Sequence, residues 1–110
     1  MNLPRIVIHC QYVYGLGHLV RALNLAKGLV EYYDVYFLNG GEAVDNLKVD
    51  SSINFIQLPA IYKEEGRSEL SSVSNDLSLT DCFKLRGQII REKIEVIAPE
   101  IVITEHFPFG

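Results

Sequence analysis

Three residues able to transfer or orient a proton stand directly after predicted turns or strands. His18 follows the turn Gly15-Leu16-Gly17, and Glu105 and His106 follow the apolar run 101–104. A neutral imidazole accepts a proton, and a carboxylate bonded to its other ring nitrogen fixes the tautomer of such a base. His18 is therefore either a general base, with Glu105 as its orienting carboxylate, or a residue that caps the helix, with Glu105 solvated.

The turn Gly15-Leu16-Gly17 runs from an apolar strand into an amphipathic helix, an arrangement typical of sites for anions or polar groups. Glycine lets the backbone approach a ligand closely or take a positive φ, and the start of a helix presents unpaired N–H groups. The spacing excludes a P-loop, which needs G-x-x-x-x-G-K-[ST]. It also departs from the dinucleotide fingerprint G-x-G-x-x-G, because Val20 stands where the third glycine belongs.

Further ligand-binding candidates follow the same predicted strand ends. Asn39 and Gly40 come after the second strand, Arg21 stands one turn into the helix, and Phe107 follows His106. An arginine can bind an anionic group, and an aromatic ring can pack against a sugar or a lipid. A surface charge for Arg21 and plain packing for Phe107 are the competing interpretations.

A metal site is not predicted. His18, Glu105 and His106 are residue types that bind zinc, but their spacing does not match that of a zinc motif. We predict no metal ion and no other cofactor.

The elements that position these residues follow from hydrophobic periodicity. Short apolar runs predict strands at 5–9, 34–38, 53–58 and 101–104. Two longer amphipathic segments predict helices. One begins at His18, and the other is capped by Thr80 and Asp81 and has an apolar stripe of Phe83, Ile90, Ile94 and Ile97. Alternating strands and helices predict an α/β fold: a Rossmann-like, three-layer α/β/α domain with a parallel sheet of about four strands in the order 3-2-1-4. That order places the turn at Gly15 to His18 beside Glu105 and His106.

The segment from Pro59 to about Leu79 is polar and contains five serines. Structureless segments of this length are uncommon in compact domains and are usually either functional lids or disordered. We therefore predict a long functional loop at the same edge of the sheet.

Composition restricts the classes of protein that remain. The 110 residues suit one domain, and the formal net charge of −4 argues against binding nucleic acid. Cys10 and Cys82 form no C-x-x-C motif, and no segment reads as a signal peptide or membrane span. We expect a reduced, cytoplasmic protein; peripheral membrane contact and homo-oligomer formation are compatible with the sequence.

Taken together, four stretches resemble one family. They are the strand end Cys10-Gln11-Tyr12-Val13-Tyr14, the run Gly15-Leu16-Gly17-His18-Leu19-Val20-Arg21-Ala22, the turn Asn39-Gly40-Gly41, and the terminal Glu105-His106-Phe107-Pro108-Phe109-Gly110. The sequence resembles, over essentially its whole length, the N-terminal domain of GT-B glycosyltransferases. Within them it is most similar to a predicted glycosyltransferase group akin to the peptidoglycan-precursor N-acetylglucosaminyltransferases.

The resemblance implies that residues 1–110 form the acceptor-side domain of a hexosyltransferase-type enzyme. The nucleotide-sugar donor would be held mainly by a C-terminal domain that this chain lacks, and the isolated chain would be inactive. His18 would be the general base, paired with Glu105, in a metal-independent transfer to a hydroxyl of a sugar or lipid-linked acceptor. Gly15 and Gly17 would shape the floor of the cleft, and the serine-rich loop would cover the acceptor.

Two other functions fit the same residues. One is a non-catalytic subunit that positions a partner enzyme. The other is a nucleotide-binding Rossmann-like module that uses the glycine turn directly.

Overall fold

The computed structural model describes residues 3–11, 17–41, 43–44, 47–63, 70–72 and 78–106, with the backbone alone described at 61–63, 70–72 and 105–106. Within these residues, four parallel strands form one sheet: β1 (Arg5–Gln11), β2 (Asp34–Asn39), β3 (Ile53–Gln57) and β6 (Ile101–His106). Their order is β3-β2-β1-β6, which confirms the predicted order 3-2-1-4.

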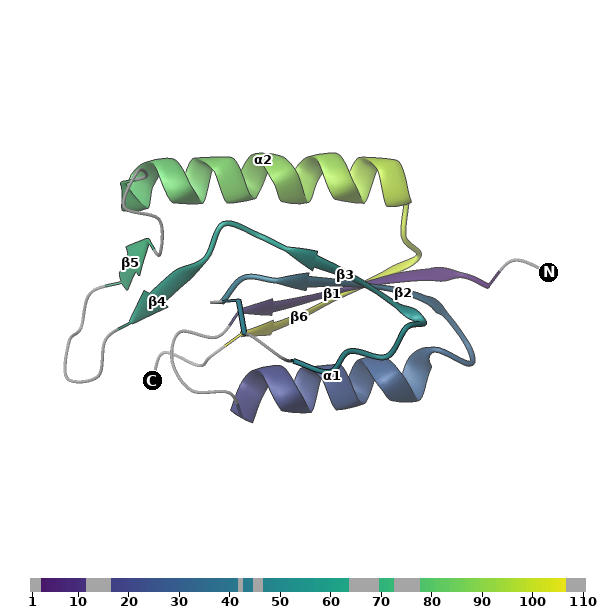
Figure 1. Cartoon of the computed structure of the whole chain (residues 1–110). Coiled ribbons are helices and arrows are strands. Elements are labelled where there is room, and N and C mark those ends of the chain that lie inside the picture. Colours follow the sequence, from purple (N-terminus) through teal and green to yellow (C-terminus); the bar gives the residue numbers. More distant parts are fainter. Residues whose placement is uncertain are drawn as a thin grey trace.

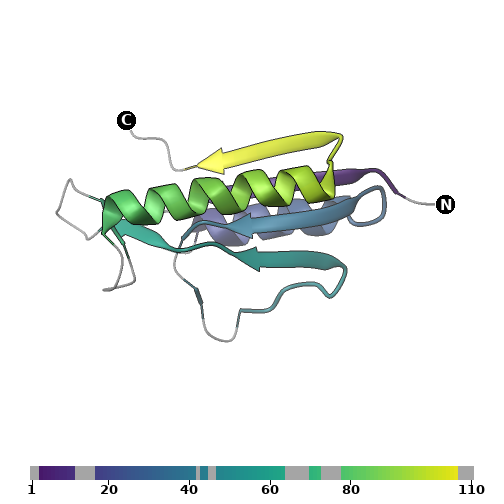
Figure 2. The same cartoon turned by 90° about the horizontal axis from the view of Figure 1, so that it is seen from above.

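Two helices enclose this sheet. Helix α1 (Gly17–Leu29) lies on one face and α2 (Leu79–Ile97) on the other, so the domain has three layers, as predicted (Figure 1). Seen from above, α2 runs along the sheet with β6 at one edge and β3 at the other (Figure 2). No helix in the described part of the chain combines the length and apolarity needed to cross a membrane.

Burial on both faces explains why the first strand is a continuous apolar run. Ile6 and Ile8 pack toward α1, whereas Val7 packs on the other side with Ile97 of α2. This alternation follows from the two-residue period of a strand. The α1 side of the core also includes Phe37, whose ring stacks on Phe55 with centroids 5.6 Å apart.

Helix α1 buries the stripe that its sequence predicts. Leu19, Leu23 and Ala26 are buried against β1 and β2, and Ala22 joins them one turn after His18. These positions recur at three- and four-residue steps and therefore share one side of the helix.

Helix α2 begins earlier than predicted, and one residue of its predicted apolar stripe is exposed. Ser78 is the cap, and its hydroxyl accepts a hydrogen bond from the amide of Asp81 at 3.1 Å. The prediction of Thr80 and Asp81 as caps was therefore wrong. Phe83 is 45% exposed, while Cys82 and Arg86 are buried. Ile97 is buried and Ile90 packs against the same part of the core, so these two positions of the predicted stripe are confirmed. Arg86 was missed because a sequence pattern treats an arginine as a surface residue.

The segment predicted as a long loop contains two short strands. β4 (Ile61–Lys63) and β5 (Leu70–Ser72) pair antiparallel, with Ile61 opposite Ser72. The predicted absence of structure was wrong here, because three-residue strands are too short to show a period. The functional role predicted for this segment stays a prediction.

Candidate functional site

The candidate site is the edge of the sheet where all four parallel strands end and both helices begin (Figure 1). Strand β6 pairs directly with β1, so that Cys10 lies opposite Glu105 and Gln11 lies opposite His106. The predicted meeting of the first and last strands is thus confirmed for the backbone. The side chains of Glu105 and His106 lie outside the described residues, as do Gly15 and Phe107.

His18 lies in the first turn of α1, half-buried at this edge. The thiol of Cys10 donates to the main-chain oxygen of His18 at 4.0 Å, which connects the start of the helix to the end of β1. The ring atom Nδ1 lies 3.3 Å from Nη2 of the exposed Arg21. Two predicted site residues, one helical turn apart, are therefore in direct contact, and Gly17 opens the same turn.

Asn39 and Gly40 end β2 in a turn that is held by neighbouring strands. The Asn39 side chain is 0% exposed; its Oδ1 accepts from the amide of Gly41 at 3.1 Å and its Nδ2 donates to Oε1 of Gln57 at 2.9 Å. Gln57, the last residue of β3, also donates to the Gly41 oxygen at 2.8 Å. The Asn39 side chain shapes the turn, and the ligand-binding role predicted for this residue stays a prediction.

Arg86 of α2 is the residue at this edge that sequence reasoning missed. Its Nη1 donates to the oxygen of Gly40 at 2.7 Å and to that of Pro59 at 2.9 Å, while Nη2 donates to Oε1 of Gln11. Gln11 in turn donates from Nε2 to the Gly40 oxygen at 3.2 Å. One guanidinium therefore joins the ends of β1 and β2 to the segment that follows β3.

The charge of Arg86 is buried among neutral oxygens. The side chain is 5% exposed, and this burial lowers the pKa of its guanidinium below the ordinary value. Among the residues that the structure describes, no carboxylate forms an ion pair with it. The sequence gives only a weak indication that Arg86 is buried: it stands four residues after Cys82 and therefore on the same side of the helix. Its neighbours in sequence do not distinguish a buried arginine from a solvated one.

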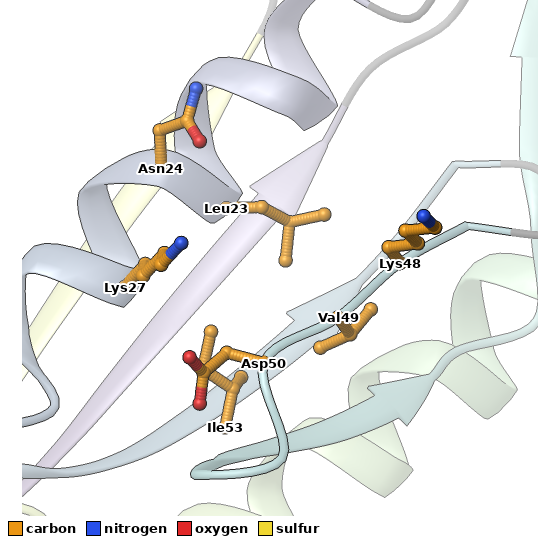
Figure 3. A pocket seen from close by; sticks show the side chains of 7 residues that line it. All are labelled: Leu23, Asn24, Lys27, Lys48, Val49, Asp50 and Ile53. Carbon is orange, nitrogen blue, oxygen red and sulfur yellow. The ribbon is translucent and has the colours of Figure 1, made fainter.

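A separate hollow of about 300 Å³ lies between α1 and the segment before β3 (Figure 3). Its floor is apolar, and Lys27, Lys48, Asn24 and Asp50 contribute the polar groups; the apolar lining residues are Leu23, Val49 and Ile53. Ile53 is the first residue of β3, so this hollow reaches the amino end of that strand. It contains none of the predicted site residues.

In the described ranges, no three side chains of histidine, cysteine, aspartate or glutamate lie close enough together to hold a metal ion.

A parallel sheet between two helical layers, with polar groups at its carboxyl edge, defines a Rossmann-like α/β domain. No protein-family model matches the chain, and no curated protein matches it. A solved structure of Phytolacca americana UGT2, complexed with UDP-2fluoro-glucose and pterostilbene, does match, with a TM-score of 0.56 and 19% sequence identity. The match covers 94% of this chain and 26% of that chain.

At this identity the likeness shows the fold alone. The chain has a glycosyltransferase-like α/β fold. This supports the resemblance to glycosyltransferases at the level of the fold. The chain spans about a quarter of the matched chain's length, 26%. The specific likeness to the peptidoglycan-precursor transferases stays a prediction.

Proposed function

We propose that this chain is the acceptor-side half of a glycosyltransferase, in which His18 removes the proton from an acceptor hydroxyl. The observation that carries the proposal is the position of His18 at the start of α1, at the edge where the paired strands β1 and β6 both end. The fold shared with UGT2, whose structure contains UDP-2fluoro-glucose and pterostilbene, supports it. A nucleotide sugar and a hydroxyl-bearing acceptor are the substrates that this proposal names.

The proposed reaction is attack of the acceptor oxygen on the anomeric carbon of the nucleotide sugar. The bond from that carbon to the nucleotide breaks as the new glycosidic bond forms, and the hydroxyl proton moves to His18. Glu105 would orient the imidazole from the end of β6, beside the end of β1. In this proposal a second, donor-binding domain holds the nucleotide.

The test is sugar transfer by the chain completed with a donor-binding domain, with the chain alone as reference. We expect transfer to need both parts and to fall about 10²–10⁴-fold in His18→Ala, the range that a general base contributes. Glu105→Gln should fall less, because it would change only the orientation of the base. Arg91→Met, at an exposed position of α2, is the matched control.

Two outcomes would contradict the proposal. Full turnover in both His18→Ala and Glu105→Gln would favour a non-catalytic subunit that positions a partner enzyme. Tight binding of a mononucleotide to the chain alone would favour a nucleotide-binding module.

A further inference from the structure

The contact between Arg21 and His18 bears on which ring nitrogen of His18 carries the proton. Nη2 of Arg21 lies 3.3 Å from Nδ1 of His18, three residues earlier on α1. A guanidinium has only donors, so Nδ1 must be the acceptor. A neutral imidazole has one protonated and one unprotonated nitrogen, so an accepting Nδ1 leaves the hydrogen on Nε2.

We infer that Arg21 is a positioning residue that holds neutral His18 in the Nε2–H tautomer. The spacing suits this role, because residues three apart on a helix are neighbours on its surface. Both residues belong to the first turns of α1, which begins at the carboxyl edge of the sheet (Figure 1). In this arrangement Nε2–H is a donor, and the lone pair of the ring is directed to the guanidinium.

This tautomer has a consequence that rests on the proposed function. A general base accepts a proton at a lone pair, and here the single lone pair of the ring belongs to Nδ1, which Arg21 covers. The hydroxyl O–H bond can break only as an Nδ1–H bond forms, and this leaves an imidazolium with hydrogen on both nitrogens. Arg21 must therefore release Nδ1 before His18 can accept the acceptor proton.

An oxyanion is the chemical group that would draw Arg21 away. A guanidinium binds phosphate or carboxylate through two parallel, charge-assisted bonds, which are stronger than one bond to a neutral ring nitrogen.

The tautomer is read directly by ¹⁵N–¹H correlation spectra of the full chain labelled in its histidines. The chain has three histidines, and loss of a signal in His18→Gln assigns that residue. We expect Nδ1 of His18 to resonate as an unprotonated nitrogen and Nε2 as a protonated one. Arg21→Met removes the donor and should give a mixture of both tautomers, whereas Arg21→Lys, which restores a donor, should recover the Nε2–H form.

Arg91→Met is the matched control, because it removes an exposed arginine from the other helix. It should leave the His18 spectrum unchanged. An Nδ1–H tautomer in the unaltered chain, or a His18 spectrum that Arg21→Met does not change, would overturn the assignment. The unchanged signals of His9 in each variant would show that the fold is intact.

The release step is tested by adding inorganic phosphate or acetate to the same sample. We expect one of them to shift the His18 pattern of the unaltered chain toward that of Arg21→Met, and to leave Arg21→Met itself unchanged. A response to phosphate alone or to acetate alone identifies the anion, and no response to either contradicts release by an oxyanion. These spectra need no turnover, so their outcome is separate from that of the transfer assay.

Discussion

The Nη1 atom of Arg86 donates to the main-chain oxygen of Gly40 at 2.7 Å, across 46 positions of sequence. Helix α2 is thereby bonded to the end of β2, at the edge where the candidate site lies. The contact also explains the glycine: a Cβ at position 40 would lie 2.6 Å from Nη2 of Arg86 and would overlap the side chain of Gln11. A larger residue at position 40 is disfavoured because the ends of the Arg86 and Gln11 side chains would have to move, and not because of a positive φ.

Gly40→Ala should therefore destabilise the chain. Arg86 and Gln11 would have to move away from their acceptors, and overpacking of this kind costs about 1–3 kcal/mol. Gly28→Ala is the control, because no atom lies within 4 Å of its added Cβ. That variant should gain about 0.5–1 kcal/mol from helix propensity, and urea unfolding of both variants would show opposite signs.

Arg86→Met should destabilise the chain more than removal of a surface arginine. It removes the charged donor from the oxygens of Gly40 and Pro59, which keep only the bond from Gln11 Nε2 and the contact from the Cys82 thiol. A hydrogen bond from a charged group contributes about 1.5–3 kcal/mol. Arg91→Met should change the free energy of unfolding by no more than about 0.5 kcal/mol. Equal losses in the two variants, measured by urea unfolding, would contradict the structural role of Arg86.

Ser78→Ala should weaken α2 by removing the bond from the Asp81 amide to the serine hydroxyl. Loss of an N-cap typically costs about 0.5–2 kcal/mol. Thr80→Ala is the informative comparison, since Thr80 lies inside the helix and does not cap it. The midpoint of thermal unfolding should be clearly lower in Ser78→Ala than in Thr80→Ala. The reverse order would support Thr80 as the cap, as predicted from sequence.

The thiols of Cys10 and Cys82 should both be protected in the folded chain, because both residues are 0% exposed. Modification by a thiol-specific aromatic disulfide should be slow in buffer and should reach both cysteines in urea. Mass spectrometry of the product would count the modified sites. Rapid modification of either cysteine in buffer would show that the core opens at that position.

The sequence by itself determined the elements and most of the topology. Apolar runs bounded by turns identified the four strands of the sheet, because these strands are covered on both faces. Helical periodicity identified α1, because a helix that packs on a sheet buries only one of its faces. The order of the strands followed from the alternation of strands and helices, which is typical of half of a doubly wound fold. From that order came the meeting of β1 with β6, and with it the expectation that His18 and Glu105 share one edge.

Only the tertiary structure decided which polar groups hold that edge together. Arg86 reaches Gln11 across 75 positions of sequence, and the side chains of Asn39 and Gln57 bond across 18. Arg21 and His18 are only three residues apart in sequence, but the tautomer of His18 can be inferred only from the positions of the two side chains. A pattern in sequence records burial, whereas the partners of a hydrogen bond are set by distance and direction in space. For this reason a buried arginine among neutral oxygens has no sequence signature.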